Sequence, residues 1–158
     1  MSIAAARIDY RLLHGIVATQ WSPVYAPQRI MIIDDKTASD SLLKDSMKMG
    51  RPAGVAISII TKEAALNNFK AKKYDGQKVL ILTEKPDVLL ELVEMGEDIG
   101  EIVIGLTRDL SNGIQVTKRA SVSQEERPVY EELLKKQVPV YCQYVPADKK
   151  VTLESCLQ

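Results

Sequence analysis

The chain has 158 residues, of which 46% are hydrophobic and 27% charged, and its 21 lysines and arginines balance its 21 aspartates and glutamates. A chain of this length forms one ordinary domain with one core, and this composition excludes both disorder and a membrane-embedded protein. Because the net charge is zero, no broad field attracts a polyanion, and nucleic acid is a poor candidate for a partner.

The beginning of the chain and its cysteines bear on its location. Residues 1–7 lack a basic segment followed by a long apolar one, and no apolar run approaches the roughly 18 residues that a membrane-spanning helix requires. Cys142 and Cys156 are too few for a disulfide framework, so we interpret both as reduced thiols. We expect a cytoplasmic protein with a single domain over residues 1–158.

Short apolar runs alternate with helical patterns from one end of the chain to the other, which predicts an α/β fold with a parallel sheet covered by helices. The runs are rich in Ile, Val or Leu, as buried parallel strands are. The predicted strands lie near Ile3–Ile8, Arg29–Ile33, Val55–Ile60, Lys78–Leu82, Glu101–Ile104 and Val138–Tyr144.

The first predicted strand leads into a loop that contains the only histidine of the chain, His14. A helical pattern follows the histidine and is expected to end before Pro23. In open parallel sheets such strand-to-helix loops lie at the carboxyl ends of the strands, where ligands bind. His14 is therefore the leading candidate for a catalytic residue.

The neighbours of His14 suit the transfer of a phosphoryl group. A neutral imidazole can attack phosphorus, Gly15 lets a bulky group approach the backbone, and the start of the helix offers free N–H groups to an anion. Arg7 and Arg11 add positive charge and could hold phosphate oxygens in a planar fork, while Asp9 could orient an arginine or the imidazole. The alternative is a histidine that only caps a helix or fills a polar loop, with both arginines as solvated charges.

Two acidic residues, Asp34 and Asp35, end the second predicted strand. They could bind a cation or face a ligand, although acidic residues after a strand often only begin the next helix. We place Asp34 near the His14 site in a supporting role.

Two helices further along carry boundary signals. Thr61 can cap a helix that extends to Lys72. In the next helix, Pro86 suits the first turn and Gly96 suits the residue after the last turn.

The pattern changes between Gly105 and Val122, where Ser111-Asn112-Gly113 predicts a turn between two short extended pieces, and therefore a small hairpin. The following Ser123-Gln124-Glu125-Glu126 has the form of a capping box for the last long helix, although Pro128 could mark a later start.

Other chemistries lack their sequence motifs. With one histidine, no zinc site of the usual His and Cys kind can form without distant carboxylates. The chain has no Gly-x-x-x-x-Gly-Lys-Ser/Thr loop, no Gly-x-Gly-x-x-Gly turn and no Gly-x-Ser-x-Gly elbow. We therefore expect no metal and no cofactor.

The segment from Arg7 to Val17, Arg-Ile-Asp-Tyr-Arg-Leu-Leu-His-Gly-Ile-Val, resembles the active-site loop of the IIB components of the mannose/fructose/sorbose family of the bacterial phosphotransferase system. The pattern of that family is Arg-Ile-Asp-Asp-Arg-Leu-Ile/Val-His-Gly-Gln-Val. The resemblance extends over nearly the whole chain. Its supporting counterparts are Ile32-Ile33-Asp34-Asp35, Gly105, Ala120-Ser121-Val122-Ser123 and Val145-Pro146-Ala147-Asp148-Lys149.

The resemblance implies a parallel sheet with helices on both faces and an antiparallel edge, and the activity of a protein-Nπ-phosphohistidine–sugar phosphotransferase. His14 would take phosphate from a phosphorylated IIA protein or domain and give it to a sugar held by the membrane IIC and IID partners. Arg11 matches the phosphate-stabilising arginine of the family, and Asp9 and Gly15 match motif positions. The chain would lie at the inner face of the membrane through its partners, with the sugar, the phosphorylated nitrogen and a homo-oligomer left open.

Three departures from the family pattern leave an alternative function open. Tyr10 replaces the second Asp, Ile16 replaces the Gln, and Gly105-Leu106-Thr107 replaces the usual Gly-Gly-Met turn. The alternative is a regulatory module without enzymatic activity that is phosphorylated at this loop or binds phosphate through it. A receiver-type phospho-aspartate domain is a more distant alternative, because its paired acids would follow the first strand, where this chain has His14.

Overall fold

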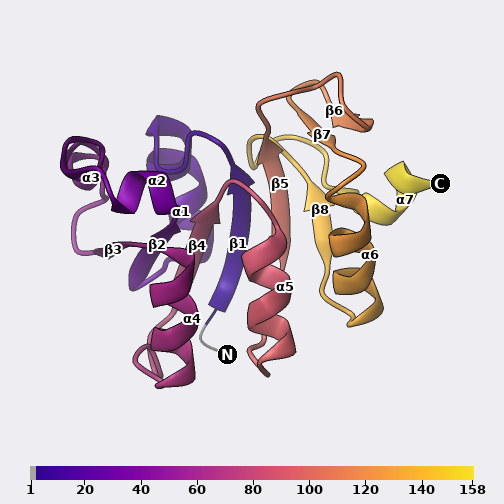
Figure 1. Cartoon of the computed structure of the whole chain (residues 1–158). Coiled ribbons are helices and arrows are strands. Elements are labelled where there is room, and N and C mark those ends of the chain that lie inside the picture. Colours follow the sequence, from indigo (N-terminus) through magenta and orange to yellow (C-terminus); the bar gives the residue numbers. More distant parts are fainter. Residues whose placement is uncertain (1–2) are drawn as a thin grey trace.

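The computed structural model describes residues 3–158, which form a mostly parallel sheet of seven strands and a separate antiparallel pair (Figure 1). All six predicted strands are present, and the last of them is shorter than predicted. The strands are β1 (Ile3–Asp9), β2 (Arg29–Ile33), β3 (Ala56–Ile60), β4 (Val79–Thr83), β5 (Ile102–Leu106), β6 (Ile114–Thr117), β7 (Ala120–Val122), β8 (Val140–Cys142) and β9 (Val151–Thr152).

The large sheet has the strand order β3-β2-β4-β1-β5-β8-β9, in which only β9 runs antiparallel to its neighbour. β1 is central, between β4 and β5, and Ile3, Ala5, Ala6 and Ile8 are all completely buried. A strand that is buried on both faces has no polar side to show, which is why its sequence is a nearly continuous apolar run.

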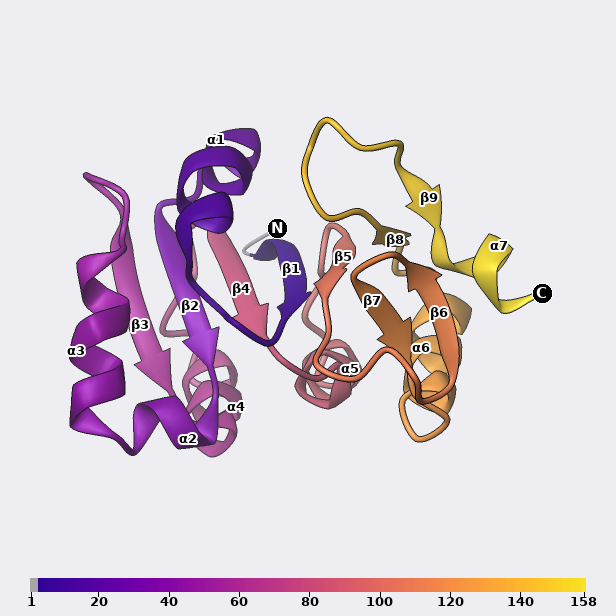
Figure 2. The same cartoon turned by 90° about the horizontal axis from the view of Figure 1, so that it is seen from above.

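Helices cover both faces of this sheet, so the predicted α/β architecture is confirmed (Figure 2). The helices α4, α5 and α6 lie on one side, and α1, with the π-helical turn η1 before it, lies on the other. The helices are η1 (Val17–Trp21), α1 (Ser22–Tyr25), α2 (Asp35–Ala38), α3 (Ser41–Met49), α4 (Lys62–Lys70), α5 (Asp87–Glu94), α6 (Arg127–Lys135) and α7 (Leu153–Leu157). None of the helices in residues 3–158 is long and apolar enough to cross a membrane.

The helix after His14 does not end before Pro23, so this prediction was wrong. Helical structure runs continuously from Gly15 through Tyr25, and its middle is widened into η1, where the N–H of Ser22 donates to the carbonyl of Val17. Pro23 lies in the first turn of α1, directly after η1, and as a proline it has no N–H to donate. The wider π turn thus lets the chain pass a residue that would interrupt a regular helix.

The hairpin is present, but its turn lies elsewhere than predicted. β6 and β7 pair antiparallel around a turn at Lys118 and Arg119. Ser111-Asn112-Gly113 instead leads into β6: the N–H of Ser111 donates to Asp109, and Gly113 has a φ of 84°. A glycine in a turn pattern predicts that the chain changes direction there, but it does not predict which of two nearby turns joins the paired strands.

The helix starts agree with their sequence signals. Thr61 caps α4 by accepting from the N–H of Ala64. Ser123 and Glu126 form the reciprocal bonds of a capping box, and α6 begins directly after them with Pro128 in its first turn.

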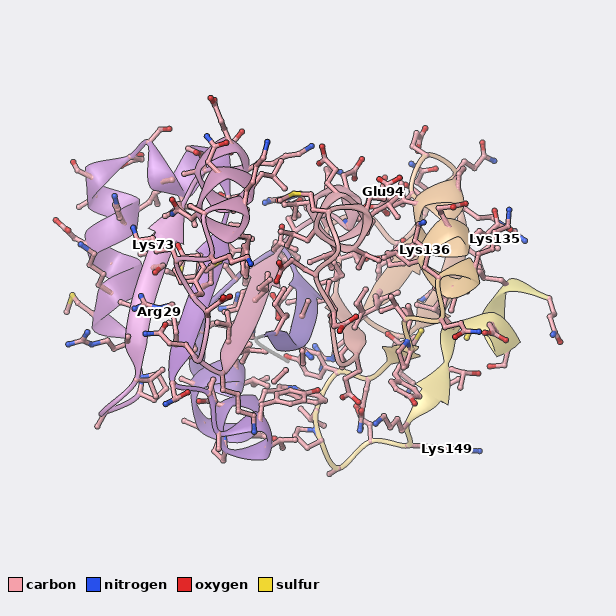
Figure 3. The ribbon with its side chains drawn as sticks, turned by 90° about the horizontal axis from the view of Figure 1, so that it is seen from below. Arg29, Lys73, Glu94, Lys135, Lys136 and Lys149 are labelled. Carbon is pink, nitrogen blue, oxygen red and sulfur yellow. The ribbon has the colours of Figure 1, made fainter. Side chains whose placement is uncertain are left out.

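The amino edge of the sheet is seen from below in Figure 3, and Arg29 lies there. Arg29, labelled at the start of β2, donates to Gln77 and to Ser58, at 2.7 Å each, and lies 5.6 Å from the ring of Tyr74. The carboxyl edge on the opposite side, where β1 ends, is the edge that carries His14.

Candidate functional site

The loop of His14 is a tight turn between the end of β1 and the helix that begins at Gly15. The N–H of Leu12 donates to the carbonyl of Asp9 at 3.1 Å, and Leu12 has a φ of 59°. This left-handed conformation is unfavourable for a leucine, but the side chains of Leu12 and Leu13 are buried in the core beneath the loop. Apolar burial therefore fixes the backbone that presents the histidine.

The imidazole of His14 is oriented by a single carboxylate. Its Nε2 lies 2.7 Å from Oδ2 of Asp9, whose side chain is completely buried, while the side chain of His14 remains 10% exposed. A carboxylate can only accept a hydrogen bond, so in the neutral imidazole Nε2 carries the proton and Nδ1 keeps its lone pair.

The other nitrogen of the ring, Nδ1, is not engaged by the described residues of the protein. It has no hydrogen-bond partner in the described part of the chain. Among residues 3–158 the only buried side-chain nitrogen or oxygen without a hydrogen bond is Oε2 of Glu91, which forms an ion pair with Lys62. Nδ1 of His14 has no hydrogen bond within this range either, so it is not a buried atom. Nδ1 is therefore the ring nitrogen that is left for a group from outside the protein.

Arg7 lies beneath the histidine and supports Asp9 instead of facing the entrance to the site. Its Nε donates to Oδ2 of Asp9 at 3.1 Å, and its two Nη atoms donate to the carbonyls of Gln143 at 3.2 Å and Tyr144 at 3.0 Å. The side chain is 1% exposed. Burial lowers the pKa of the guanidinium, and the Asp9 carboxylate opposes part of that shift.

This placement corrects the expectation that Arg7 contacts phosphate directly. The guanidinium is enclosed by the strand ends, and its bonds are made to the protein itself. Its positive charge balances the negative charge of the buried Asp9 carboxylate, and a buried charge is costly unless it is paired.

Gly105 and Trp21 close around the guanidinium of Arg7. A Cβ atom on Gly105 would lie 2.1 Å from Cζ of Arg7, so only glycine leaves room for the arginine. The Trp21 ring lies 5.0 Å from Cζ of Arg7, and its Nε1 donates to the carbonyl of Tyr144 at 2.8 Å. Sequence reasoning did not assign these roles, although an isolated glycine inside a buried strand is a signal for close approach.

Arg11 and Gly15 lie on the open side of the loop. The N–H of Arg11 donates to Oδ1 of Asp9 at 2.9 Å, which completes the bonding of that carboxylate. The guanidinium of Arg11 belongs to an exposed residue and has no hydrogen bond or ion pair within residues 3–158. A Cβ on Gly15 would meet nothing within 4 Å, so there is open space beside the histidine.

The described residues match a known protein family over their whole length. The sequence model of the family "PTS system sorbose subfamily IIB component" matches residues 3–158. The chain belongs to this family.

Relatives and a solved structure cover almost all of this IIB chain. It is 30% identical over 148 residues to the fructose-specific EIIB component of Bacillus subtilis (strain 168), covering 94% of this chain and 91% of the relative. It is 28% identical over 153 residues to the mannose-specific EIIAB component of Escherichia coli (strain K12), covering 97% of this chain but 47% of that protein. The crystal structure of the IIBSor domain of the sorbose permease from Klebsiella pneumoniae has a TM-score of 0.89 at 29% identity, over 99% of this chain and 96% of that one.

Membership in the family gives this IIB chain a general role. IIB components of the phosphotransferase system take part in the transfer of phosphoryl groups to sugars, and they work in general with IIA and with membrane IIC and IID partners. The resemblance stated from the loop sequence is thus confirmed for the family and for the fold.

Asp34 does not join the site of the IIB chain in the way the sequence suggested. Its Oδ2 accepts from the N–H of Thr37 at 3.0 Å and from the hydroxyl of Thr37 at 2.6 Å, so it caps α2. Among the described residues, Asp34 forms no hydrogen bond with Asp9 or His14. Within residues 3–158, no group of three or more His, Cys, Asp or Glu side chains is arranged to hold a metal ion.

Proposed function

We propose that this chain accepts a phosphoryl group from a phosphorylated IIA protein or domain on His14 and passes it to a sugar held by membrane IIC and IID partners. The observation that carries the proposal is the bond between His14 Nε2 and Asp9 at 2.7 Å, because it leaves Nδ1 as the free nucleophile. We assign the modification to Nδ1 for this reason.

The reaction needs two displacements and no further reactant. The lone pair of Nδ1 forms a bond to phosphorus while the bond from phosphorus to the donor imidazole breaks and leaves its electron pair on the donor. In the second step a sugar hydroxyl attacks phosphorus and releases its proton to water, while the bond from phosphorus to Nδ1 breaks and leaves its electron pair on Nδ1. We expect neither a metal nor a cofactor to take part in these two steps.

The buried ion pair below the ring supports both displacements. A phosphorylated imidazole that keeps its proton on Nε2 carries positive charge in the ring, and Asp9 stabilises that charge through the same hydrogen bond. Arg7 balances the charge of Asp9 and holds its carboxylate in place. Arg7 and Asp9 are therefore positioning residues, and His14 is the residue that reacts.

The transferred group would be held on the open side of the loop. The first amides of the helix after His14 have no intrahelical acceptors, and the space beside Gly15 admits a phosphate. We assign the exposed guanidinium of Arg11 to the equatorial oxygens of the phosphoryl group. Replacing Arg11 with Ala should then slow labelling of His14 by about 10³-fold or more, measured as the initial rate with phosphorylated IIA; an unchanged rate would return Arg11 to the role of a solvated charge.

The partners follow from the family and from one relative. The mannose-specific relative is named as an EIIAB component, and this chain matches about half of it, which supports a IIA domain as the donor. We place the protein in the cytoplasm, at the inner face of the membrane through its IIC and IID partners, as a single IIB domain over residues 1–158.

The direct test is to incubate the protein with phosphoenolpyruvate, the general phosphotransferase proteins and a IIA partner, and to look for acid-labile phosphate. The wild type should be labelled, and the variant His14→Gln should not. Absence of label on the wild type would refute the proposal. Label that is never passed to sugar in membranes containing IIC and IID would favour the regulatory alternative.

A further inference from the structure

A second exposed arginine, Arg108, lies beside the His14 loop and is held there by two side chains. Its Cζ lies 4.8 Å from the centre of the Tyr10 ring. Its Nε and Nη2 donate to the carboxylate of Glu84 at 3.0 and 3.3 Å. The side chain of Arg108 is nevertheless 65% exposed, whereas that of Glu84 is 28% exposed.

Strand register places this group next to the catalytic loop. Leu106, the last residue of β5, pairs with Asp9, the last residue of β1, and its carbonyl accepts from the N–H of Tyr10 at 3.1 Å. Arg108 follows two residues after Leu106, and Glu84 directly follows β4 on the other side of β1. Three neighbouring strand ends therefore converge on one guanidinium.

The arrangement does not serve stability to a large extent. An ion pair with a mostly exposed arginine contributes little to folding, because water solvates both partners well. An arginine on an aromatic ring is instead restricted in position while its charge stays available to an anion from outside. The bond to Glu84 can be exchanged for a bond to a more strongly charged group, since phosphate carries more negative charge than a carboxylate.

We propose that Arg108 recognises the phosphorylated histidine of the IIA donor before transfer, exchanging the Glu84 carboxylate for phosphoryl oxygens while Tyr10 holds its guanidinium beside the loop. The inference rests on the function proposed above and deepens it by naming a specificity-determining residue. It also gives a role to Tyr10, which replaces the Asp of the family pattern: its ring carries the cation. Arg108 thus affects how tightly the donor binds. The new bond still forms between His14 and the phosphoryl group.

The experiment measures the initial rate of His14 labelling against the concentration of phosphorylated IIA. Arg108→Gln should raise the KM for the donor about tenfold with little change in the rate at saturation, and it should weaken the dependence of the rate on salt. Glu84→Gln should lower the KM, because the competing carboxylate is gone. In the double variant with Arg108→Gln and Glu84→Gln, the lowering of the KM by Glu84→Gln should vanish, since Glu84 acts through Arg108.

Three controls keep the outcome specific. Arg51→Gln removes an exposed arginine from the loop that leads into β3, at the amino edge of the sheet, and should leave the KM unchanged. Tyr10→Leu removes the ring and should raise the KM in the same direction as Arg108→Gln, whereas the conservative variant Tyr10→Phe restores the ring and should bring the KM back toward the wild-type value. Unphosphorylated IIA should compete equally well for wild type and Arg108→Gln, because the contact is made to phosphate.

The two proposals fail in different ways. If the wild type is labelled and Arg108→Gln shows an unchanged KM and salt dependence, the recognition role is refuted and the proposed function stands. If the wild type is not labelled at all, both are refuted. A gain from Glu84→Gln that persists in the double variant would also overturn the role of Arg108, because Glu84 would then act on the donor directly.

Discussion

At the scale of single residues, the site depends on one buried carboxylate. Asp9 accepts from Arg7 and His14 on one oxygen and from the N–H of Arg11 on the other. Removing one partner of a buried ion pair leaves the other without compensation, which costs more than the pair itself contributes. Arg7, Asp9 and His14 must therefore be considered as a unit in any mutational experiment.

Replacing Asp9 with Asn tests this unit. The amide cannot balance the charge of Arg7 and no longer holds the proton on Nε2, so we expect a loss of about 3–5 kcal/mol in the free energy of unfolding. Labelling by phosphorylated IIA should slow by about 10²–10⁴-fold. Urea titration measures the loss of stability, and the labelling rate is measured on folded protein below the melting temperature of the variant. A normal labelling rate would contradict the role given to Asp9.

Replacing Gly105 with Ala tests the packing around Arg7. The added methyl would enter the space of a buried guanidinium, so we expect a loss of about 1–3 kcal/mol in stability together with slower labelling. Gly15→Ala is the matched control, because the same methyl meets nothing within 4 Å there. Equal melting temperatures for the two variants would show that the close approach at Gly105 does not matter in solution.

At the scale of elements, the helix after His14 connects the catalytic loop to the end of β8. Trp21, in the π-helical turn, donates to the carbonyl of Tyr144, the same acceptor that Arg7 uses. A π turn changes which residues face the sheet, because each bond spans one residue more than in an α-helix. The irregular turn thus belongs to the support of the site.

The variant Trp21→Phe removes that bond while keeping a ring against Arg7. The carbonyl of Tyr144 still accepts from Arg7, so no acceptor is left unpaired, and we expect a loss of only about 1–3 kcal/mol. Thermal melting measures the loss, and amide exchange should show it in residues 15–25 first. A larger effect on β4 than on this helix would argue against the connection.

At the scale of the whole molecule, buried ionisable groups predict a loss of stability in alkali. Burial raises the pKa of the Cys142 thiol from its ordinary value of 9.0 to about 12, and burial together with the bond to Glu101 raises the pKa of the Tyr25 hydroxyl. Both groups stay neutral in the folded chain and ionise more readily in the unfolded chain. Their contribution is therefore complete below about pH 9 and declines as the pH rises toward the folded values.

Melting curves from pH 7 to 11 under reducing conditions should show this decline beginning above the ordinary pKa of the thiol. Tyr25→Phe removes one of the two groups, so the melting temperature of this variant should fall less steeply with pH than that of the wild type. Parallel curves would show that Tyr25 ionises equally well in both states.

Much of the fold followed from local sequence patterns, and parts of the site did not. The buried strands, the cap at Thr61 and the capping box at Ser123 are local signals and were predicted. The position of His14 in a loop after β1 was predicted for the same reason. The continuation of the helix through Pro23 depends on a π turn that no nearby residue announces.

The inner half of the site depends on contacts between distant residues. The sequence suggested that Arg7 is a positive charge beside the loop, free to hold phosphate. In the folded chain, the carbonyls of Gln143 and Tyr144 and the space at Gly105 accommodate its guanidinium in the interior, where it supports Asp9. Backbone carbonyls are present at every residue, so composition cannot reveal which of them a folded chain brings together. Asp34, by contrast, follows the local rule for a helix cap, which was one of the two readings open from the sequence.

The bonds from Arg7 to Gln143 and Tyr144 join positions 136 and 137 residues apart. During synthesis, the segment that carries the histidine leaves the ribosome well before the carbonyls that anchor its support. A nascent polypeptide that stops short of Gln143 and Tyr144 therefore lacks the backbone acceptors of Arg7. Under the function proposed above, such incomplete products would be unable to draw phosphate from a IIA donor.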